Sequence, residues 1–123
     1  MKVLDNPAEL KRKQTIRKTD IVVHFKGDTI IIPPKTITLL EGFGNYTIIH
    51  TESGRRFVVS KTLKLVSQNL KKNFIRVHKA YIINSDFIIS RVDDDRLLKL
   101  AGGKEVSVSR RKIKETTLLL NAR

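Results

Sequence analysis

The sequence predicts a mainly β fold with two short helices, built as one domain of 123 residues. Most of the chain after residue 19 consists of short stretches in which apolar and polar residues alternate, as they do in strands. Turn sequences containing Gly, Pro, Asn or Asp separate these stretches. Only two segments carry a sustained helical spacing of apolar residues, so strands and helices do not alternate as in a doubly wound sheet. A chain of this length usually forms a single domain.

The first two strands are predicted to form a hairpin. Ile21, Val23 and Phe25 alternate with other residues in the manner of a strand. Residues 26–28, Lys-Gly-Asp, form a turn, and residues 29–32 return as the second strand before two prolines end it. Three further strands are predicted over residues 36–40, 46–51 and 57–59.

An amphipathic helix of about three turns is predicted to begin at Ser60, which can act as its N-cap. Leu63, Val66 and Leu70 would lie on one face of this helix, and lysines occupy many of its other positions.

Strand character then returns until a terminal helix. The predicted strands cover residues 74–83, 86–92, 97–100 and 105–108. The three aspartates at 93–95 are expected to form a solvated turn. The terminal helix begins at Ser109 and aligns Ile113, Thr117 and Leu120 on one face.

Residues 1–19 differ from the rest of the chain, since they carry six basic and two acidic residues and few apolar ones. Asn6-Pro7-Ala8-Glu9 has the order of a helix N-terminus, with Asn as the cap and Pro at the first position. Only Leu10 and Ile16 follow as large apolar residues, so such a helix would bury little. We expect a basic N-terminal tail or short helix, followed by a folded domain over residues 20–123.

Positive charge is the strongest compositional signal. The chain has 25 Lys and Arg against 12 Asp and Glu, a formal net charge of +13. Between residues 53 and 84 there are eight basic residues and no acidic one: Arg55, Arg56, Lys61, Lys64, Lys71, Lys72, Arg76 and Lys79. A surface designed only for solubility would mix the signs, so this segregation favours a side that faces a polyanion.

The sequence gives no sign of an enzyme. Without Cys there is no disulfide, thiolate nucleophile or Cys-based metal site, and the histidines at 24, 50 and 78 lack metal-ligand spacing. Residues 42–44 read Gly-Phe-Gly but lack the third glycine of a dinucleotide loop, and residues 103–104 are not followed by the Ser or Thr of a phosphate-binding loop. We expect no catalytic residues, no metal and no cofactor.

No apolar run approaches the roughly 18 residues that a membrane helix needs, and the start of the chain lacks the apolar core of a secretory signal. We therefore expect no contact with a membrane and a cytoplasmic location.

Arg110, Arg111 and Lys112 stand at the predicted start of the terminal helix, where cations are unfavourable because helix N-termini behave as partial positive charges. A bound phosphate would reverse this effect. The alternative is that these side chains extend into water.

Two other places carry side chains suited to nucleic acid. Arg76, His78 and Lys79 fall near a strand end or loop and can contact phosphates or base edges, although His78 could equally be a structural histidine. Phe43 and Tyr46 flank Asn45 in a glycine-containing loop, where the alternative is that the aromatic rings pack on the strands.

Four stretches together resemble the LytTR family, the DNA-binding domain of many bacterial response regulators. They are Leu40-Glu41-Gly42 through Asn45-Tyr46, Lys61-Thr62-Leu63, the continuous run from Phe74 to Asn84, and Val108-Ser109-Arg110-Arg111. The resemblance covers roughly residues 20–120 and implies an elongated body of small stacked antiparallel sheets. It also implies a transcription regulator that contacts double-stranded promoter DNA through loops in successive major grooves.

The resemblance also implies which residues contact DNA. Base contacts fall to Asn45, Tyr46, Lys79 and Arg111, and phosphate contacts to His78, Tyr81, Arg110 and Lys112. Ala80 stands where the family often has Ser, so one phosphate contact is absent. Because no heptad seam or long apolar strip is evident, we expect a monomer in solution that pairs on repeated half-sites of promoter DNA.

Residues 1–19 are too short to be the receiver domain that response regulators carry, so the sequence suggests either a stand-alone regulator or a part of a longer chain. Two other functions stay open: an RNA-binding or ribosome-associated basic β domain, and a basic module that docks on an acidic protein. Against RNA, the chain has five Phe, two Tyr and no Trp, and no clustered pair of aromatic strands for base stacking.

Overall fold

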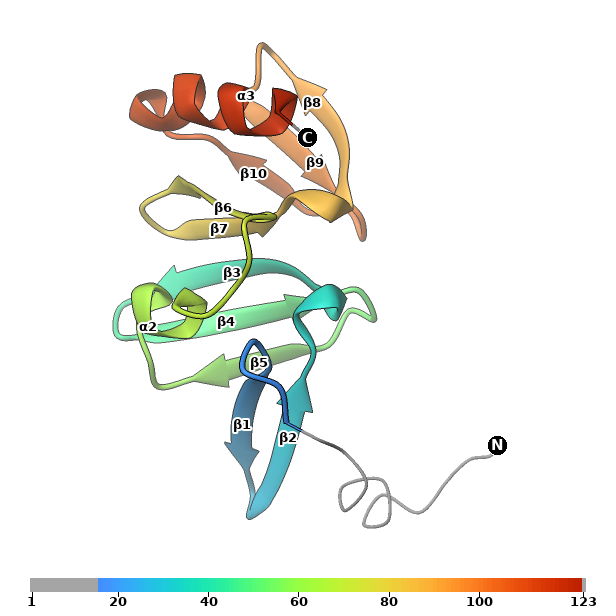
Figure 1. Cartoon of the computed structure of the whole chain (residues 1–123), viewed down its shortest axis with the longest axis vertical. Helices are drawn as coiled ribbons and strands as arrows, with labels where there is room; N and C mark the ends of the chain where they lie inside the picture. The colour runs from blue at the N-terminus through green and yellow to red at the C-terminus, as the bar shows by residue number, and fades with distance from the viewer. Residues whose placement is uncertain (1–15, 123) are drawn as a thin grey trace.

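The computed structural model describes residues 16–122 and confirms a mainly β fold with two short helices (Figure 1). The strands of this part of the chain are β1 (Ile21–Phe25), β2 (Asp28–Ile32), β3 (Ile37–Phe43), β4 (Tyr46–Thr51), β5 (Arg56–Val59), β6 (Phe74–His78), β7 (Tyr81–Asn84), β8 (Ile88–Val92), β9 (Leu97–Leu100) and β10 (Glu105–Ser107). The helices are α2 (Leu63–Ser67) and α3 (Ile113–Asn121), and the 3-10 turns are η1 (Pro34–Thr36), η2 (Ser85–Phe87) and η3 (Arg110–Lys112). The helix start expected at Asn6 lies outside the described residues.

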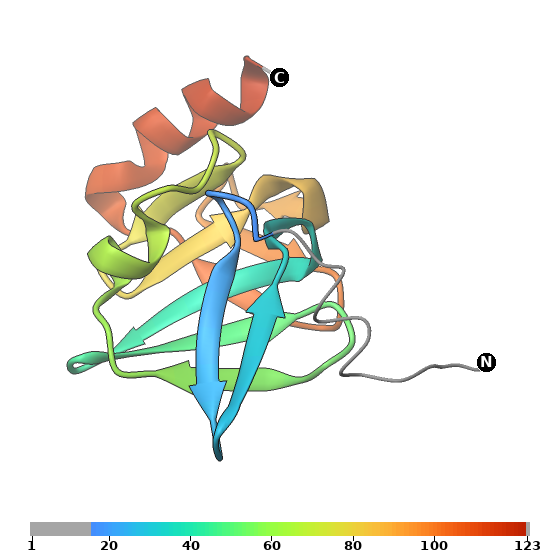
Figure 2. The same cartoon turned by 60° about the horizontal axis from the view of Figure 1, so that its bottom comes forward.

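Three antiparallel sheets are stacked along the long axis of the molecule (Figure 1). A five-stranded sheet in the order β5-β4-β3-β7-β6 forms the middle layer. The β1–β2 hairpin lies at one end and crosses in front of this sheet in Figure 2. The sheet β10-β9-β8 and helix α3 form the other end. The elongated arrangement of small stacked sheets is therefore confirmed.

Strands β3 and β7 lie next to each other in the middle sheet, and their side chains divide the interior into two cores. In this pairing Leu39 is in register with Ile83, and Leu40 with Ile82. Successive side chains of a strand point to opposite faces, so Leu39 and Ile83 enter one core while Leu40 and Ile82 enter the other. Because both faces are covered, these two strands have nearly continuous apolar sequences.

The two cores join the middle sheet to its neighbours. The C-terminal core contains Leu39, Ile75, Val77, Ile83, Leu98, Leu100, Val106 and Val108, with Ile113 and Leu120 of α3 packed against it. The N-terminal core contains Val23, Ile32, Ile37, Leu40, Ile49, Leu63 and Ile82, with Val66 of α2 among the residues at its border. Each outer layer therefore rests on its own side of the middle sheet.

A buried asparagine fixes the end of β7. The side chain of Asn84 is fully buried, and its amide group donates to the carbonyl of Ile37 at 2.8 Å. Its oxygen accepts from the backbone N–H of Asp86 and from the side chain of Asn73, both at 3.0 Å. One side chain thus ties together β3, η2 and the segment that leads into β6.

The helix expected from Ser60 is shorter and begins later than predicted. Helix α2 has five residues, and its N-cap is Thr62, whose hydroxyl accepts from the backbone N–H of Leu65 at 3.4 Å. Val66 still packs against the N-terminal core, and Leu70 does so from the segment after the helix.

The terminal helix also begins later than predicted. Its basic residues form the 3-10 turn η3, and α3 starts only at Ile113, with Glu115 in its first turn. The three basic residues therefore occupy a 3-10 turn that leads directly into α3, and not the first turn of the α-helix itself.

Two smaller predictions were also wrong. Residues 74–83 do not form one strand, because β6 and β7 pair as a hairpin around residues 79–80. The turn at 93–95 is not wholly solvated, because Asp95 is buried.

We predict that Asn84→Ala lowers the free energy of unfolding by about 1–3 kcal/mol, because the buried carbonyl of Ile37 loses its hydrogen-bond partner. Urea denaturation followed by circular dichroism measures this change. Asn69→Ala, at an exposed position, is the control and should have little effect. Equal stabilities of the two variants would show that Asn84 does not hold these segments together.

Candidate nucleic-acid interface

Three short segments meet along one edge of the stacked sheets: the β3–β4 tip (43–46), the β6–β7 tip (78–81) and the turn η3 (110–112) (Figure 1). We call this surface the loop edge. The β4–β5 and β9–β10 turns lie on the opposite side of the molecule (Figure 1). The edge brings together all eight residues that the sequence singled out for contact with DNA.

Gly42 is the point where the two hairpins of the loop edge touch. Its backbone N–H donates to the carbonyl of Ala80 at 2.7 Å. A Cβ at this position would lie 2.9 Å from Cδ1 of Leu63, closer than real Cβ contacts come. The absence of a side chain at Gly42 therefore lets the β3–β4 hairpin, the β6–β7 tip and α2 approach one another.

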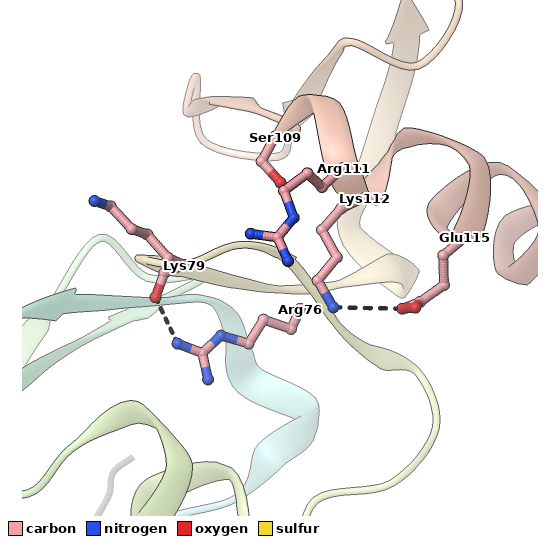
Figure 3. Close-up of a pocket in the computed structure, with 6 residues that line it drawn as sticks. All are labelled: Arg76, Lys79, Ser109, Arg111, Lys112 and Glu115. Carbon is pink, nitrogen blue, oxygen red and sulfur yellow. Dashed lines mark hydrogen bonds and ion pairs between the residues drawn. The ribbon is translucent and has the colours of Figure 1, made fainter.

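The turn at the β6–β7 tip is held from within by two side chains. Nδ1 of His78 accepts from the backbone N–H of Ala80 at 3.0 Å. The guanidinium of Arg76 donates to the carbonyl of Lys79 at 2.6 Å and to that of His78 at 3.4 Å. The Lys79 side chain, by contrast, extends away from the turn (Figure 3). The turn is thus fixed while its lysine is left to reach a partner.

Arg76 was considered for its position near the loop but was not among the predicted site residues. Its role is to hold the carbonyl groups of the turn, a contact that depends on the hairpin geometry. The only sequence signal for this role is that Arg76 precedes His78 by two residues and Lys79 by three. This spacing by itself does not indicate a particular turn.

A shallow cleft of about 440 Å³ lies between the β6–β7 tip and η3. It is lined by Arg76, Lys79, Ser109, Arg111, Lys112 and Glu115 (Figure 3). The backbone N–H of Ser109 donates to the carbonyl of Val77 at 2.8 Å and fastens η3 to β6. Glu115 is the one acidic residue that lines the cleft, and it forms an ion pair with Lys112 at 3.6 Å. The other three cations that line the cleft give it a surplus of positive charge.

A second concavity of about 380 Å³ lies beside the first and shares Arg76 and Lys79 with it. Its other lining residues are Gly42, Gly44, Thr62, Leu63, Lys64 and Ala80. Lys79 therefore borders both hollows of the loop edge.

The remaining predicted contact residues differ in how freely they face solvent. Asn45 and Tyr46 are exposed at the β3–β4 tip, and Phe43 is 72% exposed, so the alternative that the aromatic rings pack on the strands is wrong. Arg110 is exposed on η3. Tyr81 is half-buried against the C-terminal core, and its ring lies 5.2 Å from that of His78.

An ion pair fixes α3, and with it η3, on the C-terminal sheet. The guanidinium of Arg91 donates to both carboxylate oxygens of Asp95, at 2.7 and 2.6 Å. From α3, the hydroxyl of Thr117 donates to Asp95 at 2.6 Å, and the side chain of Asn121 accepts from Arg91 at 3.0 Å. The hydrogen bonds from Arg91 and then from Thr117 lower the pKa of Asp95, against the opposing effect of burial.

Within 16–122, no group of three or more His, Cys, Asp or Glu side chains could hold a metal ion. His50 is buried with Nε2 2.9 Å from Glu41. Burial lowers the pKa of His50, although the hydrogen bond to Glu41 opposes this. No helix of the same region is long and apolar enough to cross a membrane.

A β domain that presents lysines and arginines on several loops of one edge belongs to the class of nucleic-acid-binding modules. A family model described as the LytTr DNA-binding domain matches residues 27–121, and the chain belongs to this family. It is a DNA-binding domain of the type found in response regulators, as its resemblance to LytTR implied. Strand β1 precedes the matched range but completes the hairpin with β2.

The fold is similar to that of a solved structure, the LytTr DNA-binding domain of a protein described as a methyl-accepting/DNA response regulator from Bacillus cereus. The TM-score is 0.73 at 24% sequence identity, and the match covers 85% of this chain and 98% of that chain. No curated protein matches the sequence.

We predict that Asp95→Asn loosens α3 and lowers the free energy of unfolding at pH 7 by about 1–3 kcal/mol. Because the folded-state pKa of Asp95 is lowered, its contribution is present above the usual carboxyl pKa of about 3.9 and is lost as the pH falls through the folded value. The difference between wild type and variant should therefore shrink in acid, as measured by denaturation at a series of pH values.

Asp94→Asn is the matched control, because the Asp94 side chain is 96% exposed and its contact with Arg96 is long, at 3.7 Å. Both aspartates have positive φ, which Asn tolerates well. A stability difference for Asp95→Asn that stays constant down to pH 2 would contradict this assignment.

Proposed function

We propose that this chain is a sequence-specific transcription regulator that recognises double-stranded promoter DNA with its loop edge, through successive major grooves. The observation that carries the proposal is the joint position of Lys79 and Arg111 on one positively charged cleft, with the β3–β4 tip next along the same edge. A series of projecting tips suits a groove that returns to the same side of a duplex at every helical turn.

In this proposal four side chains contact bases. Arg111 suits guanine, because its planar fork matches O6 and N7, and Asn45 suits adenine for the same geometric reason. Lys79 offers a point charge that can approach guanine or a neighbouring phosphate. Tyr46 contributes a hydroxyl at the exposed β3–β4 tip.

The phosphate contacts are assigned to the residues beside these four. Arg110 and Lys112 flank Arg111 on η3, and His78 and Tyr81 flank the turn of Lys79. Because Nδ1 of His78 accepts from Ala80, Nε2 is the ring atom that can donate to a phosphate oxygen.

The test of this function is competition in a gel shift. The protein should bind a duplex selected from a random library. Neither single-stranded nor double-stranded RNA, added at the same concentration as the duplex, should displace the duplex from the protein. If RNA displaces the protein as well as the duplex does, the proposed DNA specificity is wrong and an RNA-binding function is favoured.

We further propose that the protein is a monomer in solution and that two copies occupy directly repeated half-sites. A single half-site should bind one copy weakly, and a correctly phased pair should bind two. Light scattering of the free protein measures its mass, and a stable dimer without DNA would contradict this part of the proposal.

We predict that Arg111→Ala costs about 1–3 kcal/mol on the selected site and relaxes discrimination at one base pair. Arg111→Lys keeps the charge but loses the fork, so it should reduce specificity more than non-specific binding. Binding curves on the selected site and on its single-base variants measure both effects.

Arg55→Ala is the control, because this substitution removes the same charge from the β4–β5 turn, on the opposite side of the molecule. It should lower affinity slightly and equally for every sequence. If Arg111→Ala also lowers affinity equally for every sequence, Arg111 contacts phosphate only, and base recognition falls to Lys79 and the β3–β4 tip.

A further inference from the structure

Two aromatic side chains stand uncovered at the β3–β4 tip. Phe43 is 72% exposed and Tyr46 is 48% exposed. The two residues are register partners across the hairpin, so their side chains project from the same face of the ribbon. Only Gly44 and Asn45 separate them, and the positive φ of Gly44 allows this tight connection.

The fold itself does not need an aromatic ring at position 43. Along β3 the last residue paired with β7 is Glu41, opposite Tyr81, so Phe43 lies beyond the end of that neighbouring strand. A large apolar side chain that is exposed to water at a hairpin tip does not stabilise the fold, and a polar residue would fit the turn equally well. An exposed apolar surface within a charged setting is typical of a contact site.

The surroundings of Phe43 indicate what it contacts. Lys64 and Lys79 line the concavity that begins at Gly42 and Gly44, immediately beside the tip. These cations suit phosphates, but a neutral ring does not. The apolar group that duplex DNA exposes in its major groove is the C5-methyl of thymine, and Phe is among the side chains that contact it.

A wedge inserted between base pairs fits this geometry less well. Cβ atoms of register partners in an antiparallel ribbon lie about 4.5–5.5 Å apart, whereas bases along one DNA strand rise by about 3.4 Å. A tip that carries Phe43 and Tyr46 side by side is therefore broader than one base step, and it suits the floor of a wide groove.

We propose that Phe43 recognises a thymine through its 5-methyl group, and that it is a specificity-determining residue in addition to the four assigned to base contacts. This inference rests on the proposed binding of duplex DNA. It adds an apolar contact at the β3–β4 tip to the hydrogen bonds offered by Asn45.

The experiment replaces each thymine of the selected duplex, one at a time, with deoxyuridine, which removes the methyl group and keeps the base pairing. For the wild-type protein, one or two replacements should weaken binding about fourfold, the contribution of one buried carbon group. Phe43→Ala should bind the unmodified duplex more weakly by at least the same factor and should not distinguish thymine from deoxyuridine at those positions. Phe43→Leu, which keeps an apolar surface, should retain part of the discrimination.

Phe25→Ala is the matched control, because Phe25 is also an exposed phenylalanine, at 55%, on the tip of a different hairpin away from the loop edge. It should discriminate thymine from deoxyuridine as the wild type does. Thermal unfolding of both Ala variants should match that of the wild type, since neither ring is buried.

Three results would overturn the inference: a selected site without a preferred thymine, wild-type binding that no deoxyuridine replacement weakens, or discrimination that survives in Phe43→Ala. Reduced DNA bending by Phe43→Ala without any effect of deoxyuridine would indicate a wedge instead. Failure of the wild type to bind any duplex would contradict the proposed function itself, whereas duplex binding without methyl discrimination contradicts only the role of Phe43.

Discussion

Three residues of β3 pair with three residues of β7, and this short ladder separates the two hydrophobic cores. A shift of one residue in the register of this ladder would move the side chains of Leu39 and Leu40 to opposite faces of the sheet, so that each would enter the other core. The ladder also sets where the two hairpins end, because Gly42 meets Ala80 directly after the last paired residues. The positions of the residues proposed to contact DNA at these tips therefore follow from the same pairing that holds the layers together.

The loop edge is fixed by backbone and side-chain contacts in which the side chains of Lys79 and Arg111 take no part. Ser109 fastens η3 to β6 through a backbone hydrogen bond, and Arg76 holds the carbonyl of Lys79. The pair Arg91–Asp95 secures α3 from behind, away from the cleft. The side chains that hold the loops are thus distinct from the four proposed to contact bases, as expected for a site that must keep its geometry before DNA arrives.

Sequence patterns predicted the elements that depend on local spacing and missed those that depend on distant contacts. The alternation over residues 21–25 and 46–51 gave β1 and β4 with the bounds they have in the structure. The sequence placed His78 and Lys79 only near a strand end or loop, because the β6–β7 turn contains neither Gly nor Pro and is closed by His78 and Arg76 instead. Burial of Asp95 depends on Thr117, 22 residues further along the chain, so no local pattern indicates it. The predicted contact residues came from resemblance to a family, and the structure adds that they share one edge.

Recognition of DNA by this one edge is tested most directly by a titration of the ¹⁵N-labelled protein with the selected duplex, followed by NMR. We expect the largest shifts at the backbone amides of residues 42–46, 78–81 and 109–112, with little change at 52–55 and 101–104 on the opposite side. Shifts concentrated on those opposite turns, or spread evenly over the chain, would contradict recognition by this edge.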